Sequence, residues 1–254
     1  MDEEFRNKTA LVTGASRGIG AAAAVALAQA GVSRVVIHYG NYEEGARRTS
    51  EQIRSAGAQC TLLRADLSTQ AGIQGFTAAL KGEAPAVDFL VNNAGSLVRR
   101  AKLAEFTPEL FDAVIALNVK SLWFITQAVT PHMIEQRSGV IVNVSSIAAR
   151  NGGGPGATIY AAAKAAVNGI TKGLARELAP HGVRVNAVSP GAVDNHFHEQ
   201  FTSREALERM AASTAAGRLG TNEDIADVVV FLCTSAARYI HGQTIEINGG
   251  ALMV

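Results

Sequence analysis

The chain has 254 residues, of which 48% are hydrophobic, and a formal net charge of +1 at pH 7. This length allows one large α/β domain with a buried core. The balanced charge, with scattered Lys and Arg, gives no reason to expect nucleic acid or an anionic membrane surface as a partner. An acidic start and the lack of a long apolar run predict a soluble, cytoplasmic protein. Cys60 and Cys233 show no metal-site spacing and are expected to be buried free thiols.

A strand, a glycine-rich turn and a helix follow one another at the start of the chain. Residues 8–13 have the pattern of a short buried strand, and an Ala-rich helix is expected to run to about residue 30. Between them lies the turn Gly14-Ala15-Ser16-Arg17-Gly18-Ile19-Gly20. Glycines let backbone N–H groups approach a pyrophosphate, and the helix N-terminus adds a partial positive charge. The spacing is G-x-x-x-G-x-G, and this context favours a nucleotide site over a simple turn.

The second strand, residues 34–39, bears on the choice of cofactor. In dinucleotide folds an acidic residue at the end of this strand bonds the ribose 2′-OH and disfavours a 2′-phosphate. Here the strand ends in Tyr39, Gly40 and Asn41, and no carboxylate follows until Glu43. With Arg17 beside the expected ribose, this favours NADP over NAD. The alternative is that Tyr39 and Asn41 are ordinary loop residues, and His38 is expected to be structural.

Two further strand ends carry candidate ligand contacts. After a helix over residues 43–56 and a strand over 59–64, Asp66 is predicted either to cap the next helix or to face an adenine. That helix extends to about residue 81, and a strand over residues 89–92 follows. It ends in Asn93-Ala94-Gly95, small residues that let a ligand approach closely.

The middle of the chain places polar residues in apolar surroundings. Residues 108–133 are mostly helical in pattern, and Asn118 lies inside this apolar stretch, where it needs partners. It either bonds backbone or water, or it holds a functional water. A strand over residues 139–144 ends at Ser145-Ser146, which are either turn residues or face the ligand crevice. A glycine-rich link, residues 151–156, then leads into the next helix.

Tyr160 and Lys164 are four residues apart in an Ala-rich helix expected over residues 158–180, so they share one face. A cation one turn away lowers the pKa of a phenol, which suits general acid–base catalysis. The alternative is a helix with one aromatic and one solvated lysine. The last elements expected are a strand over 183–188, a helix over 222–233 capped by Thr221, and a strand over 243–248.

In their order and spacing, these motifs resemble the short-chain dehydrogenase/reductase family, and within it the 3-oxoacyl-carrier-protein reductase-like members. The resemblance spans nearly the whole chain and rests on residues 13–20, Asp66-Leu67, Asn92-Asn93-Ala94-Gly95, Asn118, Ser146, Tyr160, Lys164, Pro190-Gly191 and Asn248-Gly249-Gly250. It implies a single Rossmann domain over residues 1–254. This α/β domain has a doubly wound, mostly parallel sheet of about seven strands with helices on both faces.

The resemblance also implies roles for individual residues. Tyr160 is the acid/base, Lys164 lowers its pKa and holds the nicotinamide ribose, and Asn118 holds a water that links Lys164 to solvent. Ser146, in preference to Ser145, bonds the substrate oxygen. The cofactor is bound by Gly14, Ser16, Arg17, Gly18, Ile19, Gly20, Tyr39, Asn41, Asp66, Leu67, Asn93, Ala94, Gly95, Tyr160, Lys164, Pro190, Gly191, Val193 and Asn195.

Two features of the C-terminal third depend on the resemblance. Asn195 stands where the family usually has a threonine that contacts the nicotinamide amide, so this contact is in doubt. Residues 192–213 correspond to a substrate lid. His196 and His198 have no further ligands clustered near them in the sequence, so no metal is expected.

The expected function is NADP(H)-dependent interconversion of a carbonyl and a secondary alcohol, in the direction of ketone reduction. The alternatives are an NAD-dependent alcohol or sugar dehydrogenase, and a non-catalytic NADP-binding sensor. The complete set of Asn118, Ser146, Tyr160 and Lys164 argues against the sensor. The resemblance implies a homotetramer, with one interface on the long helices and another near the last strand. The pair Arg99-Arg100 either attracts an anionic substrate or belongs to a solvated loop.

Overall fold

Seven strands form one parallel sheet in the order β3-β2-β1-β4-β5-β6-β7. The computed structural model describes residues 3–254. The strands are β1 (Thr9–Val12), β2 (Arg34–Tyr39), β3 (Gln59–Arg64), β4 (Phe89–Asn92), β5 (Gly139–Val144), β6 (Val183–Pro190) and β7 (Thr244–Ile247). Every pairing in the sheet is parallel. The strand order reverses between β1 and β4, and ligands bind at such a switch point, beyond the carboxyl ends of the strands.

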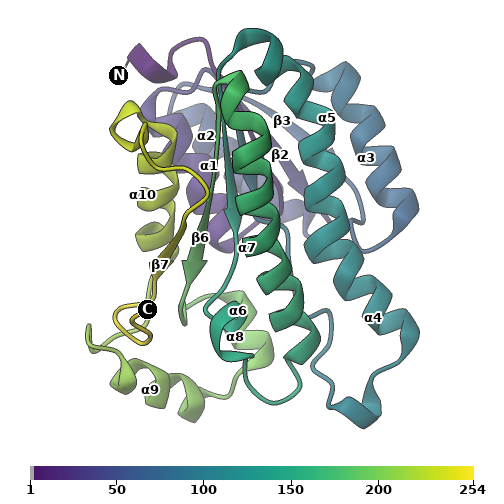
Figure 1. Ribbon diagram of the computed structural model, residues 1–254, viewed down its shortest axis with the longest axis vertical. Helices are drawn as coiled ribbons and strands as arrows, with labels where there is room; N and C mark the ends of the chain where they lie inside the picture. Colours follow the sequence, from purple (N-terminus) through teal and green to yellow (C-terminus); the bar gives the residue numbers. More distant parts are fainter. Residues whose placement is uncertain (1–2) are drawn as a thin grey trace.

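Helices cover both faces of the sheet (Figure 1). They are α1 (Gly18–Ala30), α2 (Glu43–Ser55), α3 (Gln70–Glu83), α4 (Pro108–Ile115), α5 (Ser121–Gln136), α6 (Ala148–Asn151), α7 (Thr158–Leu178), α8 (His196–Phe201), α9 (Arg204–Ser213) and α10 (Asn222–Cys233). The core on one face is built with α1, α2 and α10, and the core on the other with α3, α5 and α7. Adjacent residues of a strand face opposite sides, so Val35 and Ile37 join the first core and Val36 the second. The expected doubly wound α/β fold is confirmed.

The helical pattern over residues 108–133 contains a feature that the sequence did not predict. Between α4 and α5, residues Ala116–Lys120 form a single π-helical turn. Such turns are rare and are frequent at functional sites. This one carries Asn118, whose side chain it turns into the protein interior. The structure also divides residues 192–213 into the two helices α8 and α9, which were not predicted as separate elements.

The stretch from Pro108 to Gln136 is long and apolar enough to span a membrane, which the sequence analysis did not expect. In the 18-residue part that is apolar enough to span a membrane, 44% is buried inside the protein. Ile125, Val129 and Met133 pack in the core beneath the sheet. The stretch is therefore apolar because its buried side chains form part of the core on one face of the sheet.

Both cysteines are free thiols. Cys233 is buried, as expected, and burial raises the pKa of its thiol to about 12. Cys60 is only partly buried, because it lies on β3 at the edge of the sheet. Burial also raises its pKa. Neither thiol is activated as a nucleophile, since reactive cysteines have lowered pKa values.

Candidate active site

The turn over residues 14–20, here called the phosphate turn, follows β1 at the switch point of the sheet. Gly14 and Gly18 adopt left-handed backbone conformations with φ of +66° and +62°. At Gly20, a Cβ atom would lie 2.4 Å from the Asn93 Nδ2 and 2.5 Å from the Gly14 carbonyl oxygen. A side chain at any of these positions would be strained or would clash, so the sequence keeps the turn tight and its backbone accessible.

Asn93 braces the phosphate turn against β4. Its Nδ2 donates to the Thr13 carbonyl at 2.8 Å and to the Gly14 carbonyl at 3.1 Å. In return, the Thr13 hydroxyl accepts from the backbone N–H groups of Asn93 and Ala94, each at 3.0 Å. The Asn93 side chain, predicted to line the cofactor cleft, is therefore occupied in holding the turn in shape.

His38 supports the same turn from β2, a role that the sequence analysis described only as structural. The Gly14 N–H donates to its Nδ1 at 3.1 Å, which leaves Nε2 to donate to the Ala65 carbonyl at 3.0 Å. Burial lowers the pKa of this imidazole to about 4, so it is neutral at pH 7. A polar residue at a buried position near the carboxyl end of β2 was the only sequence signal for this role.

Arg17, predicted to contact the cofactor, packs against Tyr42, a residue for which no role was predicted. Its guanidinium sits 5.0 Å from the ring centroid of Tyr42, and that of Arg48 sits 5.4 Å from the same ring. Arg48 also bonds the Tyr42 hydroxyl. Tyr39 packs in the core on the side of α1 and α2, whereas Asn41 is exposed. The structure thus places two cations and Tyr42 at the end of β2.

Asp66 does not cap α3, which was one of the two roles predicted for it. The cap is Thr69, whose hydroxyl accepts from the Gly72 N–H. The Asp66 Oδ1 instead accepts from the backbone N–H and the hydroxyl of Ser68, at 3.0 and 2.6 Å. The Asp66 residue remains exposed, so a contact with an adenine stays a prediction. The side chain of Leu67 is buried in the core, which leaves only its backbone for a ligand.

Gly95, Asn118 and Lys164 meet at the centre of the site. A Cβ on Gly95 would lie 2.7 Å from the Asn118 Oδ1 and 2.8 Å from the Lys164 Nζ. The Asn118 Nδ2 donates to the Ser96 and Val114 carbonyls at 2.8 and 2.9 Å. Among residues 3–254, no group bonds its buried Oδ1. A buried acceptor without a partner is costly, so this oxygen is the feature that fits the predicted water.

The two serines at the end of β5 point in different directions. The Ser145 hydroxyl is buried and donates to the Lys164 carbonyl at 3.2 Å, so it ties β5 to α7. The Ser146 hydroxyl accepts from the Ala148 N–H at 3.1 Å and interacts with the side chain of Tyr160. This arrangement favours Ser146 as the residue that faces a substrate.

The pKa values of Tyr160 and Lys164 differ from the expectation. Burial raises the pKa of Tyr160 to about 12, and the interaction with Ser146 only partly opposes this rise. Burial lowers the pKa of Lys164 to about 8. The Lys164 Nζ donates to the Val144 carbonyl at 2.8 Å and lies 5.6 Å from the centroid of the Tyr160 ring. It therefore faces the ring and a carbonyl, and the expected lowering of the Tyr160 pKa does not occur in this arrangement.

Aromatic residues of α8 cover Tyr160. The ring centroids of Phe197 and Tyr160 are 5.7 Å apart, and those of Phe197 and Phe201 are 5.2 Å apart. Arg100 joins this helix to the glycine-rich link, because its Nε donates to the Phe201 carbonyl at 3.1 Å and its Nη1 to the Pro155 carbonyl at 2.6 Å. The Arg100 guanidinium therefore does not lie free in a solvated loop. Phe197 therefore packs against the predicted catalytic tyrosine, and residues 192–213 are called the lid segment below after the role predicted for them.

The start of the lid segment is tied to the loop that follows it. Val193 pairs with Gly220 in an isolated bridge, and the Val193 side chain is buried. Asn195 caps α8, since its Oδ1 accepts from the Phe197 N–H at 3.1 Å, and its Nδ2 donates to the Asn222 Oδ1 at 3.0 Å. Pro190 is the last residue of β6, and the N–H of Gly191, which follows it, donates to the Ile247 carbonyl of β7. Both the oxygen and the nitrogen of the Asn195 side-chain amide are thus already hydrogen-bonded within the protein.

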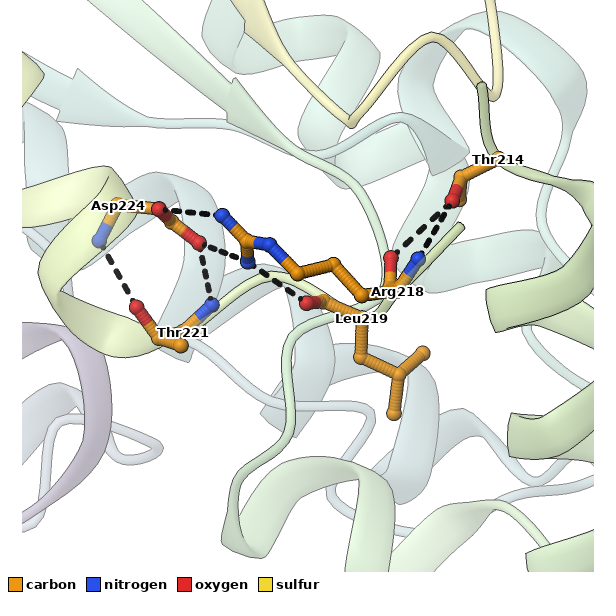
Figure 2. A network of polar contacts seen from close by, with 5 residues as sticks. All are labelled: Thr214, Arg218, Leu219, Thr221 and Asp224. Atoms are coloured by element: carbon orange, nitrogen blue, oxygen red, sulfur yellow. Dashed lines mark hydrogen bonds and ion pairs between the residues drawn. The ribbon is translucent and has the colours of Figure 1, made fainter. Parts of the chain in front are cut away.

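A polar network holds the other end of the lid segment (Figure 2). Arg218 forms a bidentate pair with Asp224 at 2.6 and 3.0 Å. Its backbone N–H and carbonyl both bond the Thr214 hydroxyl, just after α9. Asp224 and Thr221 form the capping box of α10, which confirms Thr221 as the N-cap. The Arg218 guanidinium and the Thr221 N–H hold the pKa of the Asp224 carboxyl well below its usual range.

The residues present fit a dinucleotide. The phosphate turn has positions that only glycine fills, and a helix N-terminus follows it, which is the arrangement that binds a pyrophosphate. Gly95 leaves room beside Lys164 and Asn118 at the carboxyl edge of the sheet. In residues 3–254 no group of three or more His, Cys, Asp or Glu side chains is placed to hold a metal ion.

A parallel sheet of this order, with a glycine turn at its switch point and a Tyr–Lys pair beside it, defines a dinucleotide-dependent oxidoreductase. The family model described as enoyl-(acyl carrier protein) reductase matches residues 14–251. The 3-oxoacyl-[acyl-carrier-protein] reductase FabG of Staphylococcus aureus is 39% identical over 246 residues, which cover 97% of this chain and 98% of that protein. The chain belongs to the short-chain dehydrogenase/reductase family. It is an NAD(P)-dependent oxidoreductase that acts on CH–OH groups.

Solved structures agree with this assignment. A short-chain dehydrogenase of Burkholderia cenocepacia, in complex with NADP, is 33% identical with a TM-score of 0.88, over 98% of this chain and 99% of that chain. The NADH-dependent reductase A1-R′, responsible for alginate metabolism, is 32% identical with a TM-score of 0.87, over 99% of both chains. One relative carries NADP and the other is NADH-dependent, so the family leaves the choice of cofactor open.

Proposed function

We propose that this protein reduces a ketone of the 3-oxoacyl class to a secondary alcohol with NADPH. The observation that carries the proposal is the grouping of Tyr160 with Ser146 on one side and Lys164 one turn away on the other. Its similarity to 3-oxoacyl-[acyl-carrier-protein] reductases supports the substrate class. The apolar lid residues Phe197 and Phe201 over Tyr160 suit an acyl chain beside the carbonyl.

A bound NADPH supplies the hydride, and the side chains supply position and protons. Ser146 donates a hydrogen bond to the substrate carbonyl oxygen and steadies the negative charge that develops there. Tyr160, whose pKa is raised to about 12, keeps its proton at neutral pH and gives it to the alkoxide. Lys164, Asn118 and a water on the Asn118 Oδ1 return a proton to Tyr160.

The preference for NADPH is supported by charge at the end of β2. Arg17 and Arg48 both lie within 5.4 Å of the Tyr42 ring centroid, so the two guanidinium groups converge there. An adenosine 2′-phosphate needs cationic donors, and a charge-assisted hydrogen bond to it is roughly twice as strong as a neutral one. The strand itself ends without a carboxylate, and the nearest ones, Glu43 and Glu44, are paired with Arg47 and Arg48 at 2.6 and 2.7 Å, so Arg17 is the cation left for the phosphate.

The first test is a panel of ketones and alcohols assayed with NADPH, NADH and their oxidised forms. We expect turnover of 3-oxoacyl thioesters with NADPH, and Tyr160→Phe should lose about 10²–10⁴-fold in turnover while it still binds cofactor. Tyr239→Phe is the matched control, because Tyr239 is 96% exposed and lies outside the site. Near-normal turnover of Tyr160→Phe would refute the role of this tyrosine.

Two other functions are separated by the same panel. An NAD-dependent alcohol or sugar dehydrogenase would oxidise alcohols with NAD and prefer NADH in reverse. A non-catalytic NADP-binding sensor would bind cofactor but turn over no member of the panel. The unbonded Oδ1 of Asn118 beside Lys164 favours an enzyme, because a sensor gains nothing from a buried acceptor without a partner.

A further inference from the structure

The start of the lid segment lies directly beside the phosphate turn. A Cβ added to Gly18 would lie 3.7 Å from the Asn222 Oδ1 and 3.8 Å from the Asn195 Nδ2, so little more than a methyl group would fill the space between them. Gly18 is the first residue of α1, and Asn222 is the first residue of α10. The starts of two helices and of the lid segment therefore meet where a pyrophosphate is expected to bind.

Asn195 connects this place to α8. Its Nδ2 donates to the Asn222 Oδ1 at 3.0 Å, and its Oδ1 accepts from the Phe197 N–H at 3.1 Å, which caps α8. One side-chain amide thus bonds α10 with its nitrogen and α8 with its oxygen. Phe197 in turn packs against Tyr160, with 5.7 Å between the ring centroids. A continuous series of contacts therefore runs from the phosphate turn to the predicted catalytic tyrosine.

The residue type at position 195 is what makes this connection possible. The short-chain dehydrogenase/reductase family usually has a threonine here. A threonine has a single hydroxyl, one bond nearer the backbone, so it could cap α8 but could not also reach Asn222. Asn195 has an acceptor and a donor on one amide and uses both. It therefore links α8 to α10 in a way that the usual residue does not provide.

We propose that Asn222 is a further cofactor contact and that, through Asn195, it ties the binding of the dinucleotide to the placement of α8. Asn195 occupies the Asn222 Oδ1, which leaves the Asn222 Nδ2 to donate to a pyrophosphate oxygen beside Gly18. A hydrogen bond to a charged oxygen is stronger than one between neutral groups, so the bound cofactor fixes Asn222. Asn222 then holds Asn195, and Asn195 holds the first turn of α8 with Phe197 against Tyr160. The inference rests on the phosphate turn as the cofactor site and is independent of which ketone is reduced.

The coupling is tested by hydrogen exchange of residues 196–202 with and without saturating NADPH. In the wild type, NADPH should slow this exchange by about tenfold, because it restricts local opening of α8. Asn222→Ala and Asn195→Ser should each lose this protection, although a serine at position 195 can still cap α8. The double variant should lose no more than either single variant, because all three lack the same hydrogen bond. Glu223→Ala is the matched control, since Glu223 is exposed in the same first turn of α10 and should leave the protection unchanged.

The contact with the cofactor is tested by Asn222→Asp. The carboxylate still accepts from Asn195, so α8 should keep its protection, but a negative charge now lies beside the pyrophosphate. Binding of NADPH and of NADH should weaken equally, by about tenfold or more, because both cofactors carry the pyrophosphate. Arg17→Ala, in contrast, is expected to weaken NADPH binding alone. Fluorescence titration of both cofactors separates the two effects.

Three outcomes would overturn the inference. Unchanged cofactor affinity in Asn222→Asp would show that Asn222 does not contact the pyrophosphate. Full protection of α8 in both Asn222→Ala and Asn195→Ser would show that the lid segment does not depend on this bond. Loss of protection in Glu223→Ala would show that any change at the start of α10 has the same effect. These measurements need no substrate, so failure of the proposed ketone reduction would leave them intact.

Discussion

At the scale of the residue, Lys164 is a buried cation whose charge lowers the stability of the folded protein. Burial lowers its pKa from the ordinary 10.5 to about 8, so below pH 8 the folded protein holds a buried charge. The penalty is on the order of 3 kcal/mol by the conversion of pKa shifts into free energy. The Lys164 Nζ donates one hydrogen bond, to the Val144 carbonyl, and a hydrogen bond from a charged donor is worth about 1.5–3 kcal/mol. A strongly perturbed pKa in a cleft of this kind supports the proposed role of Lys164 at the active site.

The free energy of unfolding should therefore depend on pH through Lys164. The unfolded chain keeps this proton up to about pH 10.5, whereas the folded protein releases it near pH 8. Stability rises with pH where the unfolded state binds more protons, so the penalty should lessen between pH 8 and 10.5. Lys164→Met should lack this rise when the two proteins are compared by denaturant titration. Identical pH profiles would show that Lys164 titrates normally.

Arg17 is the residue on which cofactor choice is expected to depend. A charge-assisted hydrogen bond to a 2′-phosphate is worth about 1.5–3 kcal/mol, so Arg17→Ala should weaken NADPH binding by about 10- to 100-fold. NADH binding should barely change, because it has no phosphate at that position. Fluorescence titration of both cofactors measures the difference. Equal losses would mean that the phosphate turn had collapsed, and a wild-type preference for NADH would contradict the assignment.

At the scale of the element, the lid segment is fixed at its base and held at its tip. The Arg218–Asp224 pair and the Thr214 hydroxyl secure the base (Figure 2). At the tip, Arg100 contacts both the last residue of α8 and the glycine-rich link. The base network belongs to the capping box of α10, whereas the tip is held by the ring contact of Phe197 with Tyr160 and by one exposed side chain, Arg100. We therefore expect the tip to open when substrate enters.

Arg100→Ala should release the tip of the lid segment. Its two hydrogen bonds are lost, so α8 should exchange its amide hydrogens about tenfold faster, and KM should rise more than kcat falls. Arg99→Ala is the matched control, because Arg99 contacts the Glu105 carbonyl and not α8. Hydrogen exchange of residues 196–202 measures the change. Unaltered exchange in Arg100→Ala would show that the aromatic contacts alone hold the lid.

At the scale of the whole molecule, apolar side chains remain on the outer face of α4 and α5. Phe111, Trp123 and Phe124 are each 43–45% exposed. These helices flank the π-helical turn that carries Asn118, on the side of the sheet that also holds α7 (Figure 1). Several large exposed apolar side chains on neighbouring helices favour a protein interface. They support the homotetramer that the family resemblance implies.

Light scattering at micromolar concentration should give the mass of a tetramer. Trp123→Glu places a charge in the proposed interface and should shift the mass to a smaller species. Leu103→Glu is the control, because Leu103 is 95% exposed on a separate loop and should leave the mass unchanged. A monomer mass for the wild type would rule out the assembly.

Local sequence determined most of the framework. Alternating and continuous apolar patterns placed all seven strands within about two residues, and the glycines of the phosphate turn are required by its backbone angles and close contacts. The spacing of Tyr160 and Lys164 put both on one helix face because the helical period is fixed. These features follow from the chain alone because they depend on residues near one another in sequence.

Only the tertiary structure decided which contacts form between segments that are far apart in the sequence. Asn93 and His38 brace the phosphate turn, Tyr42 packs against Arg17, and Thr69 replaces Asp66 as a cap. The π-helical turn at Asn118 packs beside α7, and burial raises the pKa of Tyr160, and no local sequence pattern records either feature. Burial and hydrogen-bond partners depend on where remote chain segments come to lie, so the electrostatics of the site could be read only from the folded protein.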